Sequence, residues 1–287
     1  MLRRHALSID LEEWYHPELV RSCLPAGERV DLAPAATRPI LDLLDRRGIQ
    51  ATFFVVGQLA QASPDLIREI AGRGHELACH TFSHRPLWEL TPASLLAELA
   101  DWRRLMCDIV GKGVWLGGFR APTFSLDERT AWAVDVLAEA GFCYDSSVFP
   151  LKTPLYGLPG APDAPYRITS TNLRRPDPAG RLVEFPLTVY RAGPLALPVS
   201  GGVYLRLLPL PVLVGCLRRI GRERPFVLYV HPWEMCNTTP KVRLPALAGL
   251  ATYYNRDVAL DKLARLLGRF EFAPLRTILA DGGWLES

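Results

Sequence analysis

Short apolar runs alternate along the chain with segments whose apolar residues recur at helical spacing. Runs with the length and composition of strands occur at 6–11, 182–189, 226–231 and near 272–279. Helical spacing predicts one helix over 37–47 and another near 256–268. Strands that alternate with helices in this way predict parallel βα units, and therefore an α/β protein.

Local signals mark the ends of the helices. Gly48 is expected to close the first helix, because glycine readily takes the left-handed conformation found just beyond a helix C-terminus. Helix starts are indicated at Ser63-Pro64, at Thr91-Pro92 and by a capping box at Ser125-Leu126-Asp127-Glu128. The helix after the capping box should stop at Gly141. The stretch 150–180 is rich in proline and turn residues, which predicts a long surface loop.

Length and composition favour one globular domain. The chain has 287 residues, of which 49% are hydrophobic and 22% charged, and α/β barrels commonly reach this size as one domain. A formal net charge of +3 without a basic run argues against nucleic-acid binding. The six cysteines are scattered without a CxxC pair, which favours reduced, buried thiols.

Targeting and membrane signals are weak. The first residues run directly into the strand at 6–11 without the apolar core of a signal peptide, and no apolar stretch reaches 18 residues. We therefore expect a cytoplasmic protein without a membrane-spanning helix. Residues 203–219 are unusually apolar and end in Arg218-Arg219. This composition suits either an element lying on anionic lipid or a core element packed on the barrel.

Two segments carry candidate metal ligands. His80 and His84 are four residues apart, so both imidazoles can turn toward one point. A nearby carboxylate would complete a three-ligand site with an open position for water, as in hydrolytic zinc centres. Asp10 and Glu12 lie two residues apart at the end of the first strand, so they share a face, and one can bind metal while the other acts as a general base. Either pair alone is also explained by solvated side chains.

Further segments complete an ordered set. They are Gly118-Phe119-Arg120-Ala121-Pro122, Gly141-Phe142-Cys143-Tyr144-Asp145 and Tyr229-Val230-His231-Pro232-Trp233. The order resembles the NodB-homology polysaccharide deacetylases, the fourth carbohydrate esterase family, whose motifs are an Asp pair, HxxxH, an Arg-Pro loop, an acidic loop and a strand-end His. The resemblance covers roughly residues 6–235, and the segments 48–57 and 74–80 look like that family's second and third strands. Asp10-Leu11-Glu12-Glu13-Trp14-Tyr15 is most similar to the subgroup found in bacterial exopolysaccharide and exosortase loci.

The resemblance implies a distorted (β/α)7-type barrel, the NodB-homology fold. It implies one catalytic domain over residues 1–287, with a proline-rich loop at about 150–180 and a C-terminal helix-strand extension at about 236–287. The implied metal ligands are Glu12, His80 and His84. Zinc is the first choice of metal, with cobalt, nickel or iron as alternatives because a mixed N/O site accepts several ions.

The resemblance also implies catalytic roles. Asp10 would take a proton from water, and Arg120 would fix Asp10 through a charge-assisted fork. A backbone N–H after Pro122 would stabilise the oxyanion, His231 would protonate the leaving amine, and Asp145 would orient His231. Each residue also has a structural explanation: an ordinary ion pair for Arg120, a core histidine for His231 and a loop cap for Asp145.

The sequence departs from the family pattern at several positions. A leucine separates Asp10 from Glu12, so Glu13 competes with Glu12 as ligand, although strand alternation favours Glu12. The fourth motif lacks the tryptophan that usually follows its aspartate, so the residue that orients His231 stays open. Substrate contacts are expected from Trp14, Tyr15, Pro122, Phe124, Tyr229 and Trp233. Burial in the core is the alternative for each aromatic ring.

The implied function is metal-dependent removal of N-acetyl groups from an N-acetylated sugar in a polysaccharide, an oligosaccharide or a lipid-linked glycan. One alternative is a deformylase or an allantoinase-like cyclic-amide hydrolase on the same scaffold. A catalytically inactive carbohydrate-binding protein is another, although loss of a motif residue would have indicated it and none is lost. The expected partner is the N-acetylated glycan. Peripheral contact with the inner membrane leaflet is expected if the substrate is lipid-linked, and the oligomeric state stays open.

Overall fold

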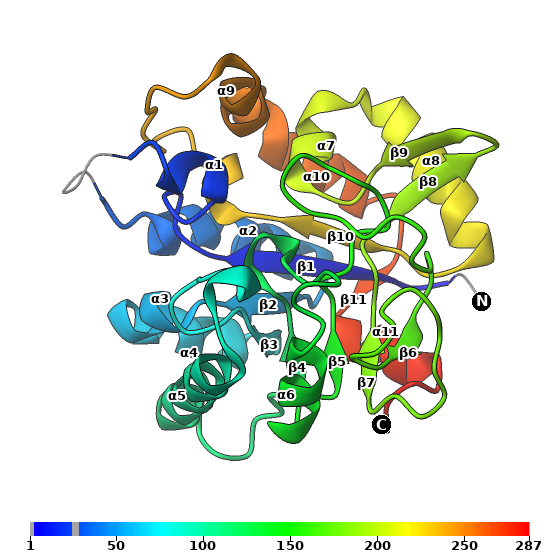
Figure 1. Ribbon diagram of the computed structural model, residues 1–287. Coiled ribbons are helices and arrows are strands. Elements are labelled where there is room, and N and C mark those ends of the chain that lie inside the picture. Colours follow the sequence, from blue (N-terminus) through cyan, green and yellow to red (C-terminus); the bar gives the residue numbers. More distant parts are fainter. Residues whose placement is uncertain (1–2, 25–28, 287) are drawn as a thin grey trace.

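The computed structural model describes residues 3–24 and 29–286. Its centre is a curled sheet with strand order β10-β1-β2-β3-β4-β5-β7-β6, flanked by helices, and β11 also pairs with β1 (Figure 1). The strands of this sheet are β1 (His5–Leu11), β2 (Thr52–Val55), β3 (Glu76–Cys79), β4 (Gly118–Phe119), β5 (Tyr144–Asp145), β6 (Tyr166–Ile168), β7 (Leu182–Glu184), β10 (Val227–Val230) and β11 (Phe272–Ala273).

The pairings are parallel except between β6 and β7, as expected for βα units. Within the described residues no pairing joins β10 to β6, so the barrel is open on one side. The predicted α/β class with a distorted barrel sheet is confirmed. A separate hairpin consists of β8 (Val189–Ala192) and β9 (Leu195–Pro198).

The helices follow several of the predicted end signals. They are α1 (Glu18–Arg21), α2 (Ala33–Arg47), α3 (Gly57–Ala62), α4 (Pro64–Gly72), α5 (Pro92–Val110), α6 (Ala133–Glu139), α7 (Gly202–Leu207), α8 (Leu210–Glu223), α9 (Ala246–Tyr253), α10 (Ala259–Leu267) and α11 (Leu275–Asp281). Gly48 closes α2 in the left-handed conformation, with a φ of 61°. The Thr91 side chain accepts the backbone N–H of Ser94 and caps α5.

The predicted capping box at 125–128 is wrong. The Ser125 hydroxyl accepts the N–H of Leu87 from a distant loop, and α6 begins only at Ala133. Thr130 instead accepts the N–H of Asp127 and closes a turn before the helix. The Ser125 side chain, which the local signal assigned to a helix cap, therefore makes a tertiary contact instead.

The predicted strand at 272–279 is also wrong beyond its second residue. Strand β11 ends at Ala273, and Pro274 follows without an N–H for a sheet ladder. Leu275, Ile278 and Leu279 then fall on the buried face of α11.

The stretch 150–180 is not only a surface loop. It contributes β6 to the sheet and buries apolar side chains, among them Leu158, Tyr166 and Leu173.

The apolar stretch 203–217 packs into the protein. It forms α7 and most of α8, and Leu213 and Leu217 on α8 are fully buried. The core alternative therefore accounts for its composition. None of the described helices is both long enough and apolar enough to cross a bilayer.

Candidate active site

The candidate residues converge at the carboxyl ends of the parallel strands. Asp10 and Glu12 stand at the end of β1, His80 and His84 follow β3, Arg120 follows β4 and His231 follows β10. A cavity of about 130 Å³ is lined by Asp10, Glu12, His80, His84 and His231. The side chains required for metal binding and for proton transfer therefore face one small space.

Glu12, His80 and His84 form the candidate metal centre. One donor atom from each lies within 4.8 Å of the other two, and all three side chains are buried. The Nδ1 of His80 lies 2.7 Å from the carbonyl oxygen of Arg120, which leaves Nε2 to bind a metal. The Nε2 of His84 is 2.5 Å from Glu12 Oε2, yet it has no hydrogen-bond partner. A cation between these two lone-pair donors would satisfy both.

The pKa values of the two histidines favour the same assignment. Burial lowers the pKa of His80 to about 4 and the pKa of His84 to about 3, so both imidazoles are neutral at pH 7, as metal ligands must be. Burial raises the pKa of Glu12, although the nearby histidines act in the opposite direction and lower it. Among the described residues no lysine or arginine pairs with this carboxylate. The donor set therefore fits a divalent cation.

Glu13, the competing carboxylate, points elsewhere. Its two oxygens accept the backbone N–H groups of Leu32 and Ala33 at 2.8 and 2.9 Å. Because these amides open α2, Glu13 acts as a cap for that helix. Glu12 is thus the acid that lies with the histidines.

The loop that carries His80 and His84 is held in place by a side chain of α5. Thr81 and His84 both have left-handed backbones, with φ values of 60° and 57°, which are uncommon for residues other than glycine. The Glu98 carboxylate accepts the N–H groups of Phe82 and Ser83 at 2.9 and 3.0 Å and also binds the Ser83 hydroxyl. Glu98 therefore stabilises the loop conformation that turns both imidazoles inward.

Asp10 is held as an ionised carboxylate. Burial alone would raise its pKa, but Arg120 and the nearby histidines outweigh it and lower the pKa below its usual value. The contact is a single hydrogen bond, from Arg120 Nη1 to Asp10 Oδ1 at 2.6 Å, and not the expected bidentate pair. The other guanidinium nitrogens bind the carbonyl and the hydroxyl of Ser146. Asp10 Oδ2 is left facing the cavity.

His231 lies opposite Asp10. Its Nε2 is 3.7 Å from Asp10 Oδ2 and 3.6 Å from Glu12 Oε1. Burial alone would lower the pKa of His231, but Glu12, Glu234 and Asp10 outweigh it and raise the pKa to about 9. His231 is therefore protonated at neutral pH and can donate a proton.

The expected orientation of His231 by Asp145 is wrong. The Nδ1 of His231 lies 2.9 Å from Glu234 Oε2, and Glu234 Oε1 in turn binds the fully buried Arg206 at 2.8 Å. Asp145 instead accepts the Ser147 hydroxyl at 2.5 Å and lies beside Glu184. Burial raises the pKa of both of these carboxyls. The sequence reasoning missed Glu234, whose signal was its place three residues after His231, and Arg206, for which the chain carries no local signal.

Replacing Glu234 with glutamine should lower kcat by about 10- to 100-fold, the usual cost of losing a partner that orients a functional histidine. Glutamine keeps the size of the side chain but removes the charge between His231 and Arg206. Bound metal should stay unchanged, since Glu234 is not among the candidate ligands. Asp145→Asn is the matched control, and steady-state kinetics on both variants should show the smaller loss there. A larger loss in Asp145→Asn would return the orienting role to Asp145.

The predicted substrate residues divide into two groups. Phe124, Tyr229 and Trp233 line the cavity, and Trp233 also donates its indole N–H to Glu12 Oε1 at 3.1 Å. Trp14 is buried and bonded to the carbonyl of Val30, while Tyr15 binds Asp31 and lines a separate hollow. These last two rings therefore belong to the core and to a neighbouring surface, outside the lining of this cavity.

Pro122 opens a strained turn at the cavity wall. Thr123 and Phe124 both have positive φ values, 56° and 49°. Phe124 and Ser125 donate their N–H groups to Ala121 and Pro122, whereas the N–H of Thr123 has no acceptor in the described part of the chain. Thr123 lines the cavity, so its amide is a candidate donor to a developing oxyanion. Leu155 and Tyr156 complete this wall and were not predicted.

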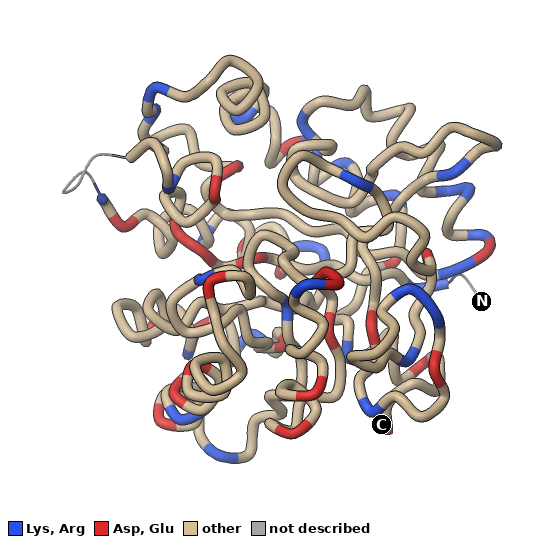
Figure 2. Tube along the Cα trace, in the orientation of Figure 1, with Lys and Arg blue, Asp and Glu red and all other residues tan. Residues whose placement is uncertain are grey.

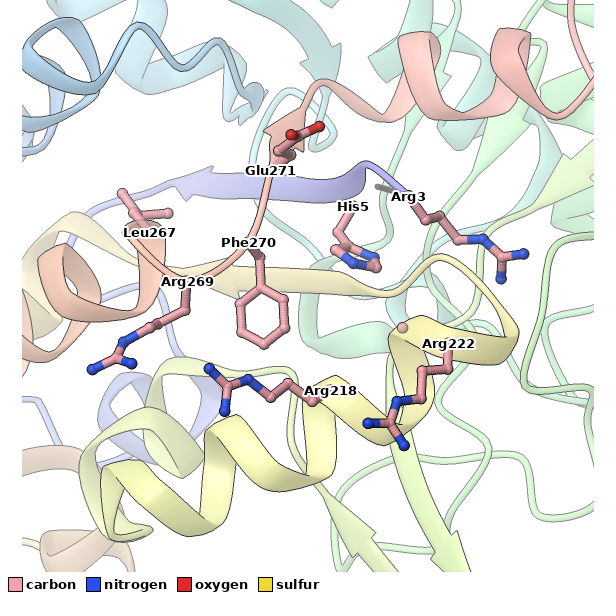
Figure 3. A pocket seen from close by; sticks show the side chains of 10 residues that line it. Arg3, His5, Arg218, Arg222, Leu267, Arg269, Phe270 and Glu271 are labelled. Atoms are coloured by element: carbon pink, nitrogen blue, oxygen red, sulfur yellow. The ribbon is translucent and has the colours of Figure 1, made fainter. Parts of the chain in front are cut away.

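Another cavity, of about 670 Å³, lies at the opposite ends of the strands. Figure 3 shows Arg3, Arg218, Arg222 and Arg269 around it, with His5 from β1 and Phe270 at its base. It is the larger space, but among the described residues the cluster of three potential metal ligands lies in the smaller cavity and not here. The smaller cavity therefore remains the candidate active site.

Sequence comparisons divide the chain into two matched segments. Residues 28–144 match the family described as polysaccharide deacetylase, and residues 146–280 match a domain of unknown function, DUF3473. The sheet crosses this boundary, since β1 pairs with β10 and β5 pairs with β7. The prediction of a single domain stays a prediction.

Curated relatives match over short stretches. The chain is 34% identical over 104 residues to chitin deacetylase 1 of Cryptococcus neoformans, which covers 36% of this chain and 22% of that protein. It is 39% identical over 66 residues to a chitooligosaccharide deacetylase of a Bradyrhizobium species, 23% of this chain and 30% of that protein. The matches thus span less than a third of these relatives.

Solved structures show a shared fold along nearly the whole chain. A Mycobacterium smegmatis protein with a provisional polysaccharide deacetylase assignment superposes with a TM-score of 0.64 and 22% identity, covering 98% of this chain and 90% of that one. A structure of Puue allantoinase superposes with a TM-score of 0.60 and 16% identity, covering 98% and 91%.

Proposed function

We propose that the segments matching polysaccharide deacetylase and DUF3473 together form one metal-dependent hydrolase that removes N-acetyl groups from an N-acetylated sugar. The observation that carries the proposal is the shared cavity, which is lined by a three-ligand metal set, by an ionised carboxylate and by a protonated histidine. Relatives described as chitin and chitooligosaccharide deacetylases support this substrate class.

Glu12, His80 and His84 would hold the metal. When bound there, a divalent cation would polarise the amide carbonyl and lower the pKa of water beside it. We propose zinc, with cobalt, nickel or iron as alternatives, because two imidazoles and one carboxylate accept several ions.

Asp10 and His231 divide the proton transfers in the proposed reaction. Asp10 Oδ2 accepts a proton from the attacking water while the oxygen of that water bonds to the amide carbon. His231 Nε2 then donates a proton to the amide nitrogen while the carbon–nitrogen bond breaks, which yields acetate and a free sugar amine. The Thr123 N–H would donate to the oxyanion formed between these two steps.

The DUF3473 segment supplies the proposed general acid and the residues that contact it. Tyr229, His231 and Glu234 all fall within residues 146–280, as does Arg206. The polysaccharide deacetylase match ends at residue 144 and contains the two histidines and Arg120 but no candidate general acid. We therefore infer that the second segment completes the catalytic centre and is not a separate accessory module.

The first motif supports a narrower subgroup and a location for the protein. Asp10-Leu11-Glu12-Glu13-Trp14-Tyr15 supports the exopolysaccharide and exosortase subgroup, and with it a glycan that is modified before export. A cytoplasmic location belongs to the same proposal.

Acetate release tests the proposed function. Purified protein loaded with zinc would be incubated with chitooligosaccharides and with other N-acetylated glycans, and free acetate and new amines would be measured. We expect both products in equal amounts from at least one glycan. N-formylated sugars and allantoin serve as parallel substrates, and turnover of those alone would replace this proposal with the deformylase or cyclic-amide alternative.

A further inference from the structure

Helix α9 exposes apolar side chains beside the active site. Leu247 is 82% exposed and Leu250 48% exposed, and Thr252 is the one buried residue of this helix. Figure 1 shows α9 standing out from the sheet next to α1. A surface helix usually turns its apolar residues toward the core, so adjacent exposed leucines indicate a contact surface.

The helix that carries the exposed leucines also lines the catalytic cavity. Ala251 and Thr252 of α9 line that cavity. Leu155, 38% exposed, lines it from the loop that follows β5. Two elements far apart in the sequence therefore present apolar side chains at one opening. We call Leu155, Leu247 and Leu250, with the cations described next, the mouth rim.

Basic residues accompany each apolar part of the mouth rim. Lys241 and Arg243 precede α9 and are exposed, and Lys152 is exposed three residues before Leu155. From Met235 to Arg256 the chain has no acidic residue, and Figure 2 shows the basic pair in the loop before α9. In the described residues none of these three cations has an ion-pair partner. Exposed leucines flanked by unpaired cations are the composition of an element that lies in the headgroup layer of an anionic membrane.

We propose that the mouth rim docks on an anionic phospholipid bilayer, with Leu247 and Leu250 inserted among the headgroups and the catalytic cavity opening toward the membrane surface. This inference rests on the proposed function and narrows its substrate class to an N-acetylated glycan attached to a membrane lipid. It also moves the membrane contact from residues 203–217, where Leu205, Leu213 and Leu217 are buried, to α9.

Vesicle flotation tests the docking surface. Full-length protein would be floated with vesicles of phosphatidylglycerol and phosphatidylcholine, and with vesicles of phosphatidylcholine alone. We expect binding to the anionic vesicles, weakened by salt, and little binding to the neutral ones. The pair Leu247→Gln with Leu250→Gln should lower binding at least tenfold. The pair Lys241→Glu with Arg243→Glu should lower it by a similar factor, since each basic residue near an anionic surface contributes roughly fivefold.

Leu195→Gln with Val212→Gln is the matched control. These residues are 55% and 47% exposed, and they lie on β9 and α8, outside the cavity lining. This pair should bind vesicles like the unaltered protein. Equal loss in both apolar pairs, or no flotation of the unaltered protein, would overturn the proposal. Light scattering that finds a dimer dispersed by Leu247→Gln with Leu250→Gln would assign the surface to a second copy of the chain instead.

Activity on a soluble substrate separates this inference from the proposed function. Protein that releases acetate from chitooligosaccharides but does not float retains the proposed function and loses the docking surface. Protein that floats through α9 but releases no acetate from any N-acetylated glycan retains the surface and loses the proposed function.

Discussion

Protein with His84 replaced by alanine is expected to lose its bound metal and its hydrolytic activity together. His84 contributes one of three donor groups, and the Glu12 carboxylate that faces it at 2.5 Å would be left buried without a cation. Activity should fall by more than about 100-fold, because the loss of groups that merely support a ligand already costs about 10- to 100-fold.

Metal content by mass spectrometry and acetate release on the same sample would check this result. The matched control is His75→Ala, which also removes a buried imidazole. The Nδ1 of His75 accepts the Ala51 N–H at 3.2 Å, away from the cavity. That variant should keep its metal. Full metal occupancy in the His84→Ala protein would contradict the proposed ligand set.

Asp10→Asn is expected to retain the metal and to lower kcat by about 100-fold or more, the usual contribution of a general base. Asparagine keeps an oxygen for the Arg120 contact at 2.6 Å but cannot take a proton from water. The structure makes Asp10 suitable as a base because the arginine occupies only Oδ1 and leaves Oδ2 facing His231.

The comparison with Glu12→Gln separates base from ligand. Glu12→Gln should lose metal before any chemical step is affected, whereas Asp10→Asn should bind metal normally and fail in turnover. Titration of the apo-proteins with zinc, followed by single-turnover measurements at saturating metal, distinguishes the two defects. The opposite pattern would exchange the roles of the two acids.

Local signals were sufficient for the framework of the site. A buried parallel strand is encoded by a short apolar run, and the residue after that run stands at the catalytic edge of the sheet. Asp10 and His231 could therefore be assigned to this edge from the apolar runs before them, whereas the strand before His80 was implied by the family resemblance. Gly48 and Thr91 gave the helix ends for the same reason, since each acts on neighbouring backbone groups.

Partners that come from distant segments were harder to predict. The choice of Glu234 over Asp145 depends on Arg206, which α7 brings to the far side of Glu234. Neither strand spacing nor motif order contains that information. The expected role for Asp145 followed the family pattern, although the tryptophan missing from this motif was a sign of departure.

Tertiary packing separated side chains that the sequence treated alike. Trp14 and Trp233 each lie two residues after a motif residue, Glu12 and His231, yet Trp14 donates its indole N–H to the carbonyl of Val30 while Trp233 stacks on His231 with ring centroids 5.4 Å apart. The exposed leucines of α9 and the buried leucines of α8 likewise have similar local composition. Only the packing of the whole chain decides which of them reach solvent.

The sequence by itself determined the α/β class, the order of the strands that carry the motifs and the residue types available for catalysis, because these depend on short-range periodicity and on side-chain chemistry. The tertiary structure decided which carboxylate lies with the histidines, which acid orients His231, and which apolar segment is left exposed at the opening of the cavity. Those outcomes depend on contacts between segments tens to hundreds of residues apart, where burial and competing hydrogen-bond partners change the result that local propensity predicts.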